Sequence, residues 1–177
     1  MTETEIILGC QAYEKSAFKE LVKTYSPSMM SLCIRYTGDQ YLAQDMLQET
    51  FITVFKHILK YKPTGSFKSW LHRIAVTTCL KELRSRRQAV FLDLDDYEEV
   101  PEDEPPTMVD EFGMMQIISE LPEQYRLVFN LFVIEGYNHR EIAEMLDIQE
   151  RTSRVQLTRA RKYVRQLYLA YNQTENI

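Results

Sequence analysis

One stretch near the carboxyl end, residues 136–168, constrains the fold more than any other part of the chain. Asn138 followed by Glu141 has the spacing of a capping box, in which each side chain accepts from the other residue's backbone N–H, so a helix is predicted directly after Asn138. Apolar residues then recur at helical spacing up to Asp147, a residue type that tolerates the left-handed conformation of a tight turn. A second helix is predicted from about Glu150. Two helices joined by so short a turn form a helix-turn-helix.

The second of these helices separates apolar from basic residues. The positions expected to pack inward are Ile148, Leu157, Ala160 and Val164. The positions expected to stay outside are basic or hydroxylated: Arg151, Thr152, Arg154, Thr158, Arg159, Arg161 and Lys162. Cations on one face of a packed helix pair are typical of a surface that binds the phosphates and base edges of DNA.

Composition favours helices throughout the 177-residue chain. It has only five glycines and few β-branched runs, and its 45% of hydrophobic residues is enough for folded cores. The predicted fold class is therefore all-α. No apolar run approaches the length of about twenty residues that spans a membrane, and no charged and then apolar leader stands at the start. We expect a cytoplasmic protein without membrane insertion.

The net charge of −5 conceals regions of different sign. Residues 1–90 carry 13 Lys and Arg against 8 Asp and Glu, residues 91–125 carry none against 12, and residues 126–177 carry 8 against 6. The acidic region is also rich in proline, a composition that is not expected to fold by itself. We therefore expect two small helical domains joined by an acidic flexible linker, the second domain ending in the helix-turn-helix: residues 1–89, the linker 90–108, and residues 109–177.

Cysteine and histidine usage favours neither a metal site nor a cofactor. The residues concerned lie far apart and form no CxxC pair: Cys10, Cys33, Cys79, His57, His72 and His139. We expect buried free thiols and no metal or cofactor, with a metal or redox site as the alternative. No cluster of His, Cys or carboxylate residues has catalytic spacing, which disfavours an enzyme.

A helix predicted over residues 41–58 has two different faces. The stripe expected to face the core consists of Leu47, Phe51, Val54, Phe55 and Ile58. A second face carries residues at spacings of three, four and seven: Asp45, Gln48, Glu49 and Ile52. This second face is either solvated or a surface on which another protein docks. In the preceding helix, Pro27 is expected to cause an interruption, and Gly38 and Asp39 are expected to end that helix.

A loop over residues 60–66 is followed by a predicted helix over residues 67–86. One stripe of this helix is polar and basic: Arg73, Thr77, Lys81 and Arg84. Aromatic residues stand beside its start: Tyr61, Phe67 and Trp70. Aromatic faces next to cations are what the binding of unstacked bases requires. The alternative is that Phe67 and Trp70 are core residues and that the basic stripe is only solvated.

Four segments, in this order, resemble promoter-binding regions two and four of the extracytoplasmic-function (ECF) sigma factors of bacterial RNA polymerase. They are DMLQETFITVF, GSFKSWLHRIAVTTCLKELRSRR, LPEQYRLVFNLFVIEGYNHREIAEML and RTSRVQLTRARKYV. The resemblance covers about residues 5–168. It implies that the first domain binds core polymerase and melts the minus-10 promoter element, and that the second reads the minus-35 element. The implied partners are core RNA polymerase, promoter DNA and an anti-sigma factor.

The resemblance also assigns roles to residues. The face of Asp45, Gln48, Glu49 and Ile52 matches the surface that docks on the polymerase clamp helices. The loop and the helix after it match the part that captures a flipped base and lies along the minus-10 element: Tyr61, Lys62, Phe67, Trp70, Arg73, Thr77, Lys81 and Arg84. The outer face of the helix from Glu150 matches the minus-35 reader. The chain departs from the family at several positions, with Thr77 where Asn is common, Lys81 where Asp is common and Ser153 where Val is common.

Two questions stay open at this level. An ordinary helix-turn-helix regulator of duplex operator DNA would explain residues 136–168 equally well, although it leaves the loop aromatics and the Asp45 face without a role. The acidic linker is expected to run extended between the domains. It is either a soluble tether or a segment that occupies the basic nucleic-acid channel of polymerase until RNA displaces it.

Overall fold

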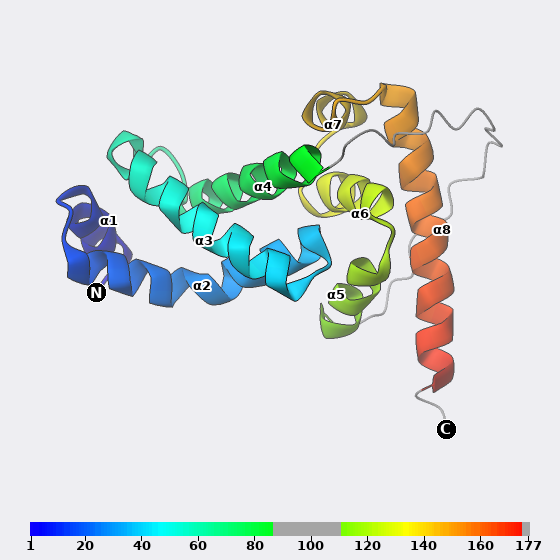
Figure 1. Ribbon diagram of the computed structural model, residues 1–177, viewed down its shortest axis with the longest axis horizontal. Helices are drawn as coiled ribbons and strands as arrows, with labels where there is room; N and C mark the ends of the chain where they lie inside the picture. The colour runs from blue at the N-terminus through cyan, green and yellow to red at the C-terminus, as the bar shows by residue number, and fades with distance from the viewer. Residues whose placement is uncertain (87–110, 175–177) are drawn as a thin grey trace. The chain divides into compact units, whose positions relative to one another are not determined.

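The computed structural model describes residues 1–86 and 111–174, and the regular elements within those two ranges are all helices (Figure 1). The chain divides into two compact units, Met1–Leu83 and Arg84–Ile177. The prediction of an all-α protein with two helical domains is therefore confirmed. The predicted acidic linker, residues 90–108, lies outside the described residues, so the domain limits at 89 and 109 stay predictions.

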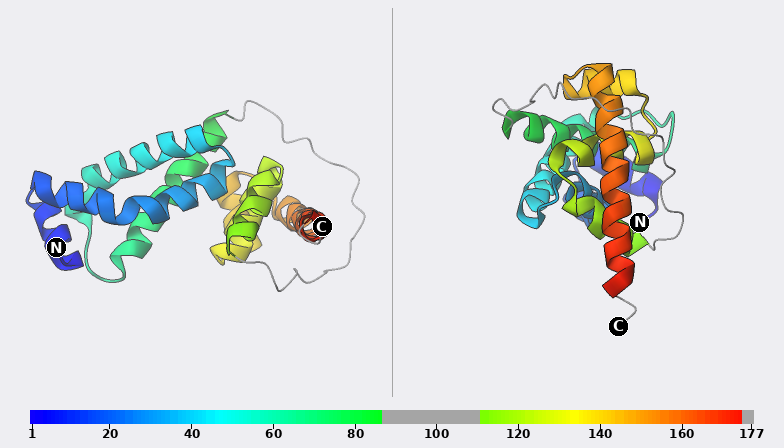
Figure 2. Two further views of the ribbon diagram at one scale, coloured as in Figure 1. Left: turned by 90° about the horizontal axis from the view of Figure 1, so that it is seen from below. Right: turned by 90° about the vertical axis from the view of Figure 1, so that its right-hand side faces the viewer.

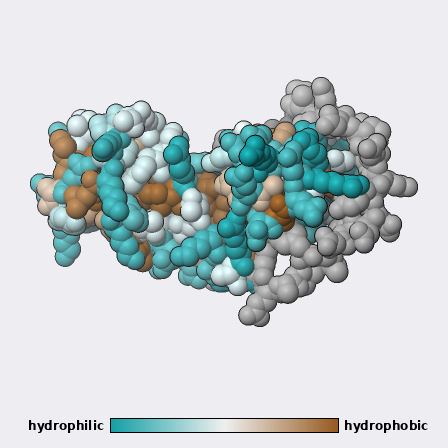
Figure 3. Space-filling model, turned by 90° about the horizontal axis from the view of Figure 1, so that it is seen from above, coloured by the Kyte–Doolittle hydropathy of each residue, from teal (hydrophilic) through white to brown (hydrophobic). Residues whose placement is uncertain are grey.

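The first unit is a packed set of helices. In chain order they are α1 (Glu3–Gln11), α2 (Lys15–Thr37), α3 (Gln40–His57), the 3₁₀ turn η1 (Ile58–Lys60) and α4 (Phe67–Arg86). Helices α2 and α3 lie side by side in both ribbon views (Figures 1 and 2). Their shared core is apolar and includes the fully buried Leu21, Met29, Tyr36 and Val54. The surface of the first unit is mostly hydrophilic, with hydrophobic patches at the end that carries α1 (Figure 3).

The turn between α2 and α3 follows from two adjacent residues. Gly38 ends α2 in the left-handed conformation, with φ of 67°, which costs glycine little because it has no Cβ. Asp39 then caps α3, and its Oδ1 accepts a hydrogen bond from the Leu42 N–H at 2.7 Å. The prediction that Gly38 and Asp39 close the element is confirmed.

The expected interruption at Pro27 does not occur, and this prediction is wrong. Helix α2 runs through the proline without a break, and Pro27 lies exposed on its outer side. Buried residues on both sides of it, among them Tyr25 and Met29, hold the two halves of the helix against the same core. Burial of this apolar face outweighs the one backbone hydrogen bond that proline cannot donate.

The core stripe of α3 matches the prediction in part. Phe51, Val54 and Ile58 are buried as predicted. Leu47 and Phe55, which the pattern also assigns to the core, are only half-buried. Phe55 lies at the rim, where its ring meets Phe18 of α2 edge-on at 4.2 Å. A small helical unit of this size has too little interior to enclose every apolar position of a stripe.

The cysteines are buried free thiols, as predicted. Burial and the neighbouring Glu14 carboxylate raise the pKa of Cys10 to about 11. A hydrogen bond to Cys33, together with burial, raises the pKa of Cys79. Among the described residues no cluster of His, Cys, Asp and Glu could hold a metal ion. No described helix combines the length and the apolar character needed to cross a membrane.

The second unit ends in the helix-turn-helix. It contains α5 (Glu111–Glu120), α6 (Glu123–Phe129), the π-helical turn η2 (Asn130–Ile134), α7 (His139–Leu146) and α8 (Glu150–Thr174). Its core consists of apolar side chains from all of these elements, among them Ile118, Leu127, Leu131, Ile142 and Val164. Pro122 occupies the N-cap position directly before α6. Gly136 ends the α6–η2 segment with φ of 77°, so a residue with a Cβ would be strained there.

Candidate nucleic-acid and polymerase interfaces

The polar face predicted on α3 is an exposed surface. Asp45, Gln48 and Glu49 are exposed, and Ile52 keeps 40% of its surface accessible. The opposite face of α3 fixes the helix against the core through Ala43, Met46, Thr50 and Val54. The structure therefore brings the four predicted docking residues together on one outward-facing side of a firmly packed helix. Two carboxylates beside an isolated apolar side chain suit a basic partner surface.

The aromatic residues beside the loop form a cluster with one partly exposed member. Phe67 is fully buried, Tyr61 is only 8% exposed, and Trp70 is half-buried. The Phe67 and Trp70 rings are stacked at 5.6 Å and 22°, and the Tyr61 ring touches both from the side. Phe67 is a core residue, which is the alternative that the sequence left open, and its ring has no accessible face for a base. Of the three rings, Trp70 offers surface to a ligand while Phe67 and Tyr61 support it.

Hydrogen bonds fix the start and the shape of the loop over residues 61–66. The Tyr61 hydroxyl donates to the Gly65 carbonyl at 3.0 Å, which closes the loop on itself. The Gln11 side chain of α1 donates to the Ile58 carbonyl at 3.2 Å and to the Tyr61 carbonyl at 3.4 Å. The role of Gln11 could not be predicted from the sequence, because Gln11 contacts residues 47 and 50 positions away and such contacts leave no local pattern.

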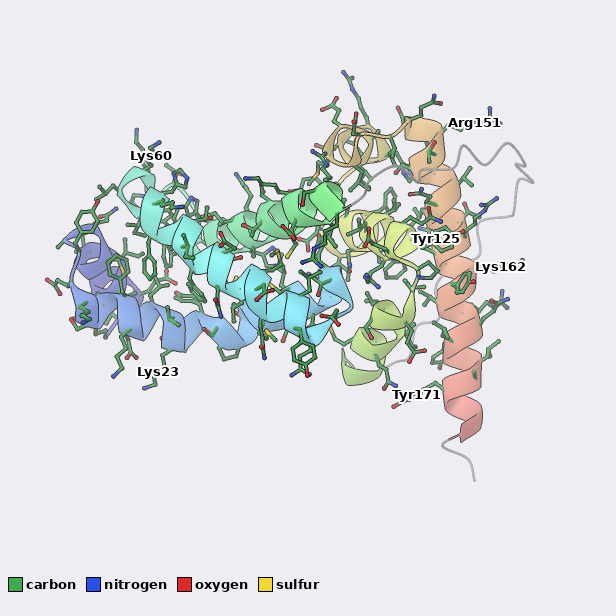
Figure 4. The ribbon with its side chains drawn as sticks, in the orientation of Figure 1. Lys23, Lys60, Tyr125, Arg151, Lys162 and Tyr171 are labelled. Carbon is green, nitrogen blue, oxygen red and sulfur yellow. The ribbon has the colours of Figure 1, made fainter. Side chains whose placement is uncertain are left out.

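Cations surround this loop and continue along α4. Lys60, Lys62 and Lys68 are exposed, and Lys60 projects away from the body of the unit (Figure 4). The predicted stripe is exposed along its whole length: Arg73, Thr77, Lys81 and Arg84. The Thr77 hydroxyl donates to the Arg73 carbonyl at 2.8 Å, so its oxygen stays able to accept a bond from a ligand. The arrangement provides positive charge for a nucleic-acid backbone next to one aromatic ring.

The helix-turn-helix has the local geometry that the sequence predicted. The Glu141 N–H donates to Asn138 Oδ1 at 3.0 Å, and the Asn138 N–H donates to Glu141 Oε2 at 2.8 Å, which completes the capping box. Asp147 ends α7 in the left-handed conformation, with φ of 56° and ψ of 52°. Ile142 and Leu146 are buried against the rest of the unit, while Ala143 is half-buried.

The outer face of α8 is only partly as exposed as predicted. Arg151, Arg154 and Lys162 are exposed, and Arg151 and Lys162 project from the side of α8 that faces away from α6 (Figure 4). The other predicted contacts are half-buried: Thr152, Thr158, Arg159 and Arg161. Arg154 forms an ion pair with the Glu150 carboxylate one turn earlier. The Arg161 guanidinium lies over the Phe132 ring at 5.9 Å, and this contact accounts for its partial burial.

A polar contact that the sequence pattern does not predict joins α7 to α8. Ser153 is fully buried, and its hydroxyl lies 2.9 Å from His139 Nδ1. The His139 ring in turn stacks on Phe132 at 4.5 Å and 24°. The serine that replaces the family's frequent valine thus exchanges an apolar contact for a hydrogen bond between the two helices. The sequence signal for this bond is a serine at an inward-facing position of α8, because a buried hydroxyl needs a hydrogen-bond partner.

Family models match both units. The model of sigma-70 region 2 matches residues 21–89, and that of sigma-70 region 4 matches residues 112–164. The chain is similar to the ECF RNA polymerase sigma factor SigE of Mycolicibacterium smegmatis, with 33% identity over 90% of this chain and 64% of that protein. It is 28% identical to the RNA polymerase sigma-H factor of Pseudomonas aeruginosa, over 92% of this chain and 91% of the relative.

Solved structures share the fold. One is CnrH in complex with the cytosolic domain of CnrY, with a TM-score of 0.50, 20% identity and coverage of 93% of this chain and 96% of that one. Another is the sigma factor RpoE in complex with the anti-sigma factor NepR from Bartonella quintana, with a TM-score of 0.50, 18% identity and coverage of 85% and 96%.

Two helical units carrying a region-2 match and a region-4 match define a protein of the transcription-initiation machinery. The chain belongs to the sigma-70 family and is an ECF sigma factor, which directs transcription initiation by RNA polymerase. A regulator that only binds operator DNA would have no use for a region-2 domain, so the alternative reading of the helix-turn-helix is not supported.

Proposed function

We propose that this sigma factor uses three separate surfaces, each on a different helix. The outer face of α3 docks on core polymerase through Asp45, Gln48, Glu49 and Ile52. The loop after η1 and the stripe of α4 bind the unpaired minus-10 strand. The outer face of α8 reads the minus-35 duplex. The single observation that carries this proposal is that one chain joins an exposed acidic helix face to two basic surfaces that are suited to DNA.

The minus-10 surface binds through charge and one stacking ring. Trp70 stacks on an unpaired base, because its ring is half-buried whereas Phe67 and Tyr61 lie in the core. Lys62, Arg73, Lys81 and Arg84 contact phosphates, and Thr77 accepts one hydrogen bond. Stacking on an aromatic ring is worth about 1–3 kcal/mol per base, and it is available only when the base has left the duplex. The surface therefore binds melted DNA more tightly than paired DNA.

The contacts of the minus-35 surface are spread along α8 and differ in how exposed they are. Arg151 and Arg154 stand in the first turns of the helix and are exposed, as base-reading residues of a helix-turn-helix are. Thr152 and Thr158 offer hydroxyls from half-buried positions. Arg159, Arg161 and Lys162 lie further along the helix and contact phosphates. Arginine suits the base contacts because its planar fork donates two parallel hydrogen bonds to guanine.

The protein acts by binding and does not catalyse a covalent change in DNA. Promoter opening needs only that the unpaired strand is bound more tightly than the duplex. We further propose that it works in the cytoplasm and that an anti-sigma factor controls it. The second proposal has support from CnrH and RpoE, which share the fold and whose structures are complexes with CnrY and the anti-sigma factor NepR.

A charge reversal tests the docking surface. The double variant Asp45→Lys and Glu49→Lys should fold normally, because both side chains are exposed, and should lose most of its co-purification with core polymerase. Specific promoter binding should depend on core polymerase for the wild-type protein and should fail for this variant. The matched control Glu120→Lys and Glu144→Lys changes the net charge equally, at exposed residues of the second unit, and should retain core binding. Unchanged co-purification of the docking variant would contradict the assignment.

A further inference from the structure

Helix α1 makes two connections to the ends of the loop over residues 61–66, which is the proposed minus-10 loop. The first is the Gln11 side chain, whose amide group donates to the carbonyls of Ile58 and Tyr61 at 3.2 and 3.4 Å. These carbonyls flank the 3₁₀ turn η1, where the chain leaves α3 and enters the loop. A carboxamide has two N–H donors, so one side chain can satisfy both carbonyls. Gln11 is half-buried, which protects the bonds from competing water.

The second connection runs through aromatic rings. The Tyr25 hydroxyl of α2 donates to Glu3 Oε2 of α1 at 2.7 Å, and burial together with this bond raises the pKa of Tyr25. The Tyr25 ring packs edge-on against Phe67 at 5.6 Å, and Phe67 packs against Tyr61 at 5.0 Å. Helix α1 is thereby joined to both sides of the loop, at Tyr61 where it starts and at Phe67 where α4 begins.

The loop is consequently held at its two ends while its middle is exposed. Lys62, Pro63, Thr64, Gly65 and Ser66 are all exposed. A loop with fixed ends loses less conformational entropy when it closes on a ligand than one whose ends can move. The region-2 match starts at residue 21, so α1 lies outside the part of the chain that the family model covers.

We propose that α1 positions the minus-10 loop and that Gln11 is the principal positioning residue, an inference that rests on the proposed role of this loop in binding the unpaired strand. Gln11 does not touch DNA. It holds the backbone of Tyr61 so that Trp70 and Lys62 stand in place before the strand arrives.

The variant Gln11→Met tests the proposal, because methionine keeps the length and helix propensity of glutamine but cannot donate. The holoenzyme with this variant should bind the single-stranded non-template minus-10 segment of a mapped promoter about tenfold more weakly, the factor expected for losing two hydrogen bonds of ordinary strength. Its affinity for core polymerase and for minus-35 duplex should not change. Gln11→Lys restores a donor of similar reach and should recover part of the loss.

Two further measurements separate positioning from general damage. Trp70 is the only tryptophan in the chain, so its fluorescence in the free protein reports on the loop base. Acrylamide should quench it more strongly in Gln11→Met than in the wild type, and Gln11→Lys should reverse the change. Gln116→Met removes a helical glutamine of the second unit and should alter neither the quenching nor the binding of the single strand.

The outcomes are distinct. Normal single-strand binding by Gln11→Met, together with weaker binding by Trp70→Ala, would overturn the role of α1 and leave the proposed minus-10 surface intact. Normal binding by both variants would overturn the minus-10 surface itself. Loss of core binding and minus-35 binding along with the single strand would show that Gln11 serves the fold in general, and this would also overturn its role as a positioning residue.

Discussion

Two exposed cations of α8, Arg154 and Lys162, illustrate how much the surroundings of a residue decide its role. The Arg154 guanidinium is paired with Glu150, and both side chains are well exposed, at 62% and 46%. Such a pair contributes about 0.3–0.5 kcal/mol in a helix, too little to hold the arginine back from DNA. The ion pair nevertheless limits the directions in which the Arg154 guanidinium points. Lys162 projects from the middle of the helix as a mobile point charge, which suits a phosphate (Figure 4).

The two residues should therefore respond differently to truncation. Arg154→Ala should reduce the free energy of binding to the cognate minus-35 element by about 1–3 kcal/mol and relax specificity at one base pair. Lys162→Ala should weaken binding to all DNA sequences alike and reduce the slope of log affinity against log salt by about 1. Binding isotherms of the holoenzyme on cognate and scrambled elements at several salt concentrations measure both effects. Equal losses on the two elements for Arg154→Ala would mean that this arginine binds phosphate.

At the same scale, the sequence predicts the aromatic cluster beside the loop but not which of its rings is accessible. Tyr61, Phe67 and Trp70 lie together as their positions suggested, yet which ring is enclosed depends on Tyr25 and α1, which are distant in sequence. Gln11 could not be found at all, because its partners are backbone carbonyls and every residue has one. Residue types thus indicate the chemistry of a surface, while tertiary contacts decide which members are accessible.

At the scale of elements, α2 shows that a helix can continue through a proline when both halves are buried on the same side. Pro27 removes the N–H that would bond to the Lys23 carbonyl, and it stands where the helix faces solvent. Nearby hydroxyls bond the backbone of this turn, with Ser28 Oγ donating to the Tyr25 carbonyl at 3.1 Å and Ser31 Oγ donating to the Pro27 carbonyl at 3.2 Å.

Replacing this proline should stabilise the first unit. Pro27→Ala restores the missing N–H and a residue with high helix propensity at an exposed site, for an expected gain of roughly 1–3 kcal/mol in the free energy of unfolding. Chemical denaturation followed by Trp70 fluorescence measures it, because that tryptophan lies in the first unit. Pro63→Ala, in the exposed loop, is the control and should leave stability lower or unchanged. A less stable Pro27→Ala protein would contradict this account of α2.

The elements that could be predicted are those whose signals are local. The capping box of Asn138 and Glu141, the left-handed Asp147 and the Gly38–Asp39 turn all depend on residues within one turn of each other, and each is confirmed. The continuity of α2 and the bond between Ser153 and His139 depend on packing between elements, which the pattern of a single helix does not contain.

At the scale of the whole molecule, charge is distributed by region. The part before residue 91 carries 13 Lys and Arg against 8 Asp and Glu, and the part after residue 125 carries 8 against 6. Between them, residues 91–125 carry 12 carboxylates and no Lys or Arg. DNA repels such a segment, whereas the basic channel through which polymerase passes nucleic acid attracts it. We propose that the linker, residues 90–108, occupies this channel in the holoenzyme until RNA displaces it.

Neutralising the linker at constant length separates this role from that of a tether. The change replaces eight acidic residues with Ser and Gln: Asp93, Asp95, Asp96, Glu98, Glu99, Glu102, Asp103 and Glu104. Because chain length and reach are kept, a tether would function normally after the change. A segment held in the channel by its charge would bind core polymerase more weakly, and the holoenzyme would release a different proportion of short abortive RNAs. Wild-type core affinity together with a wild-type pattern of abortive products would leave the linker no role beyond joining the two domains.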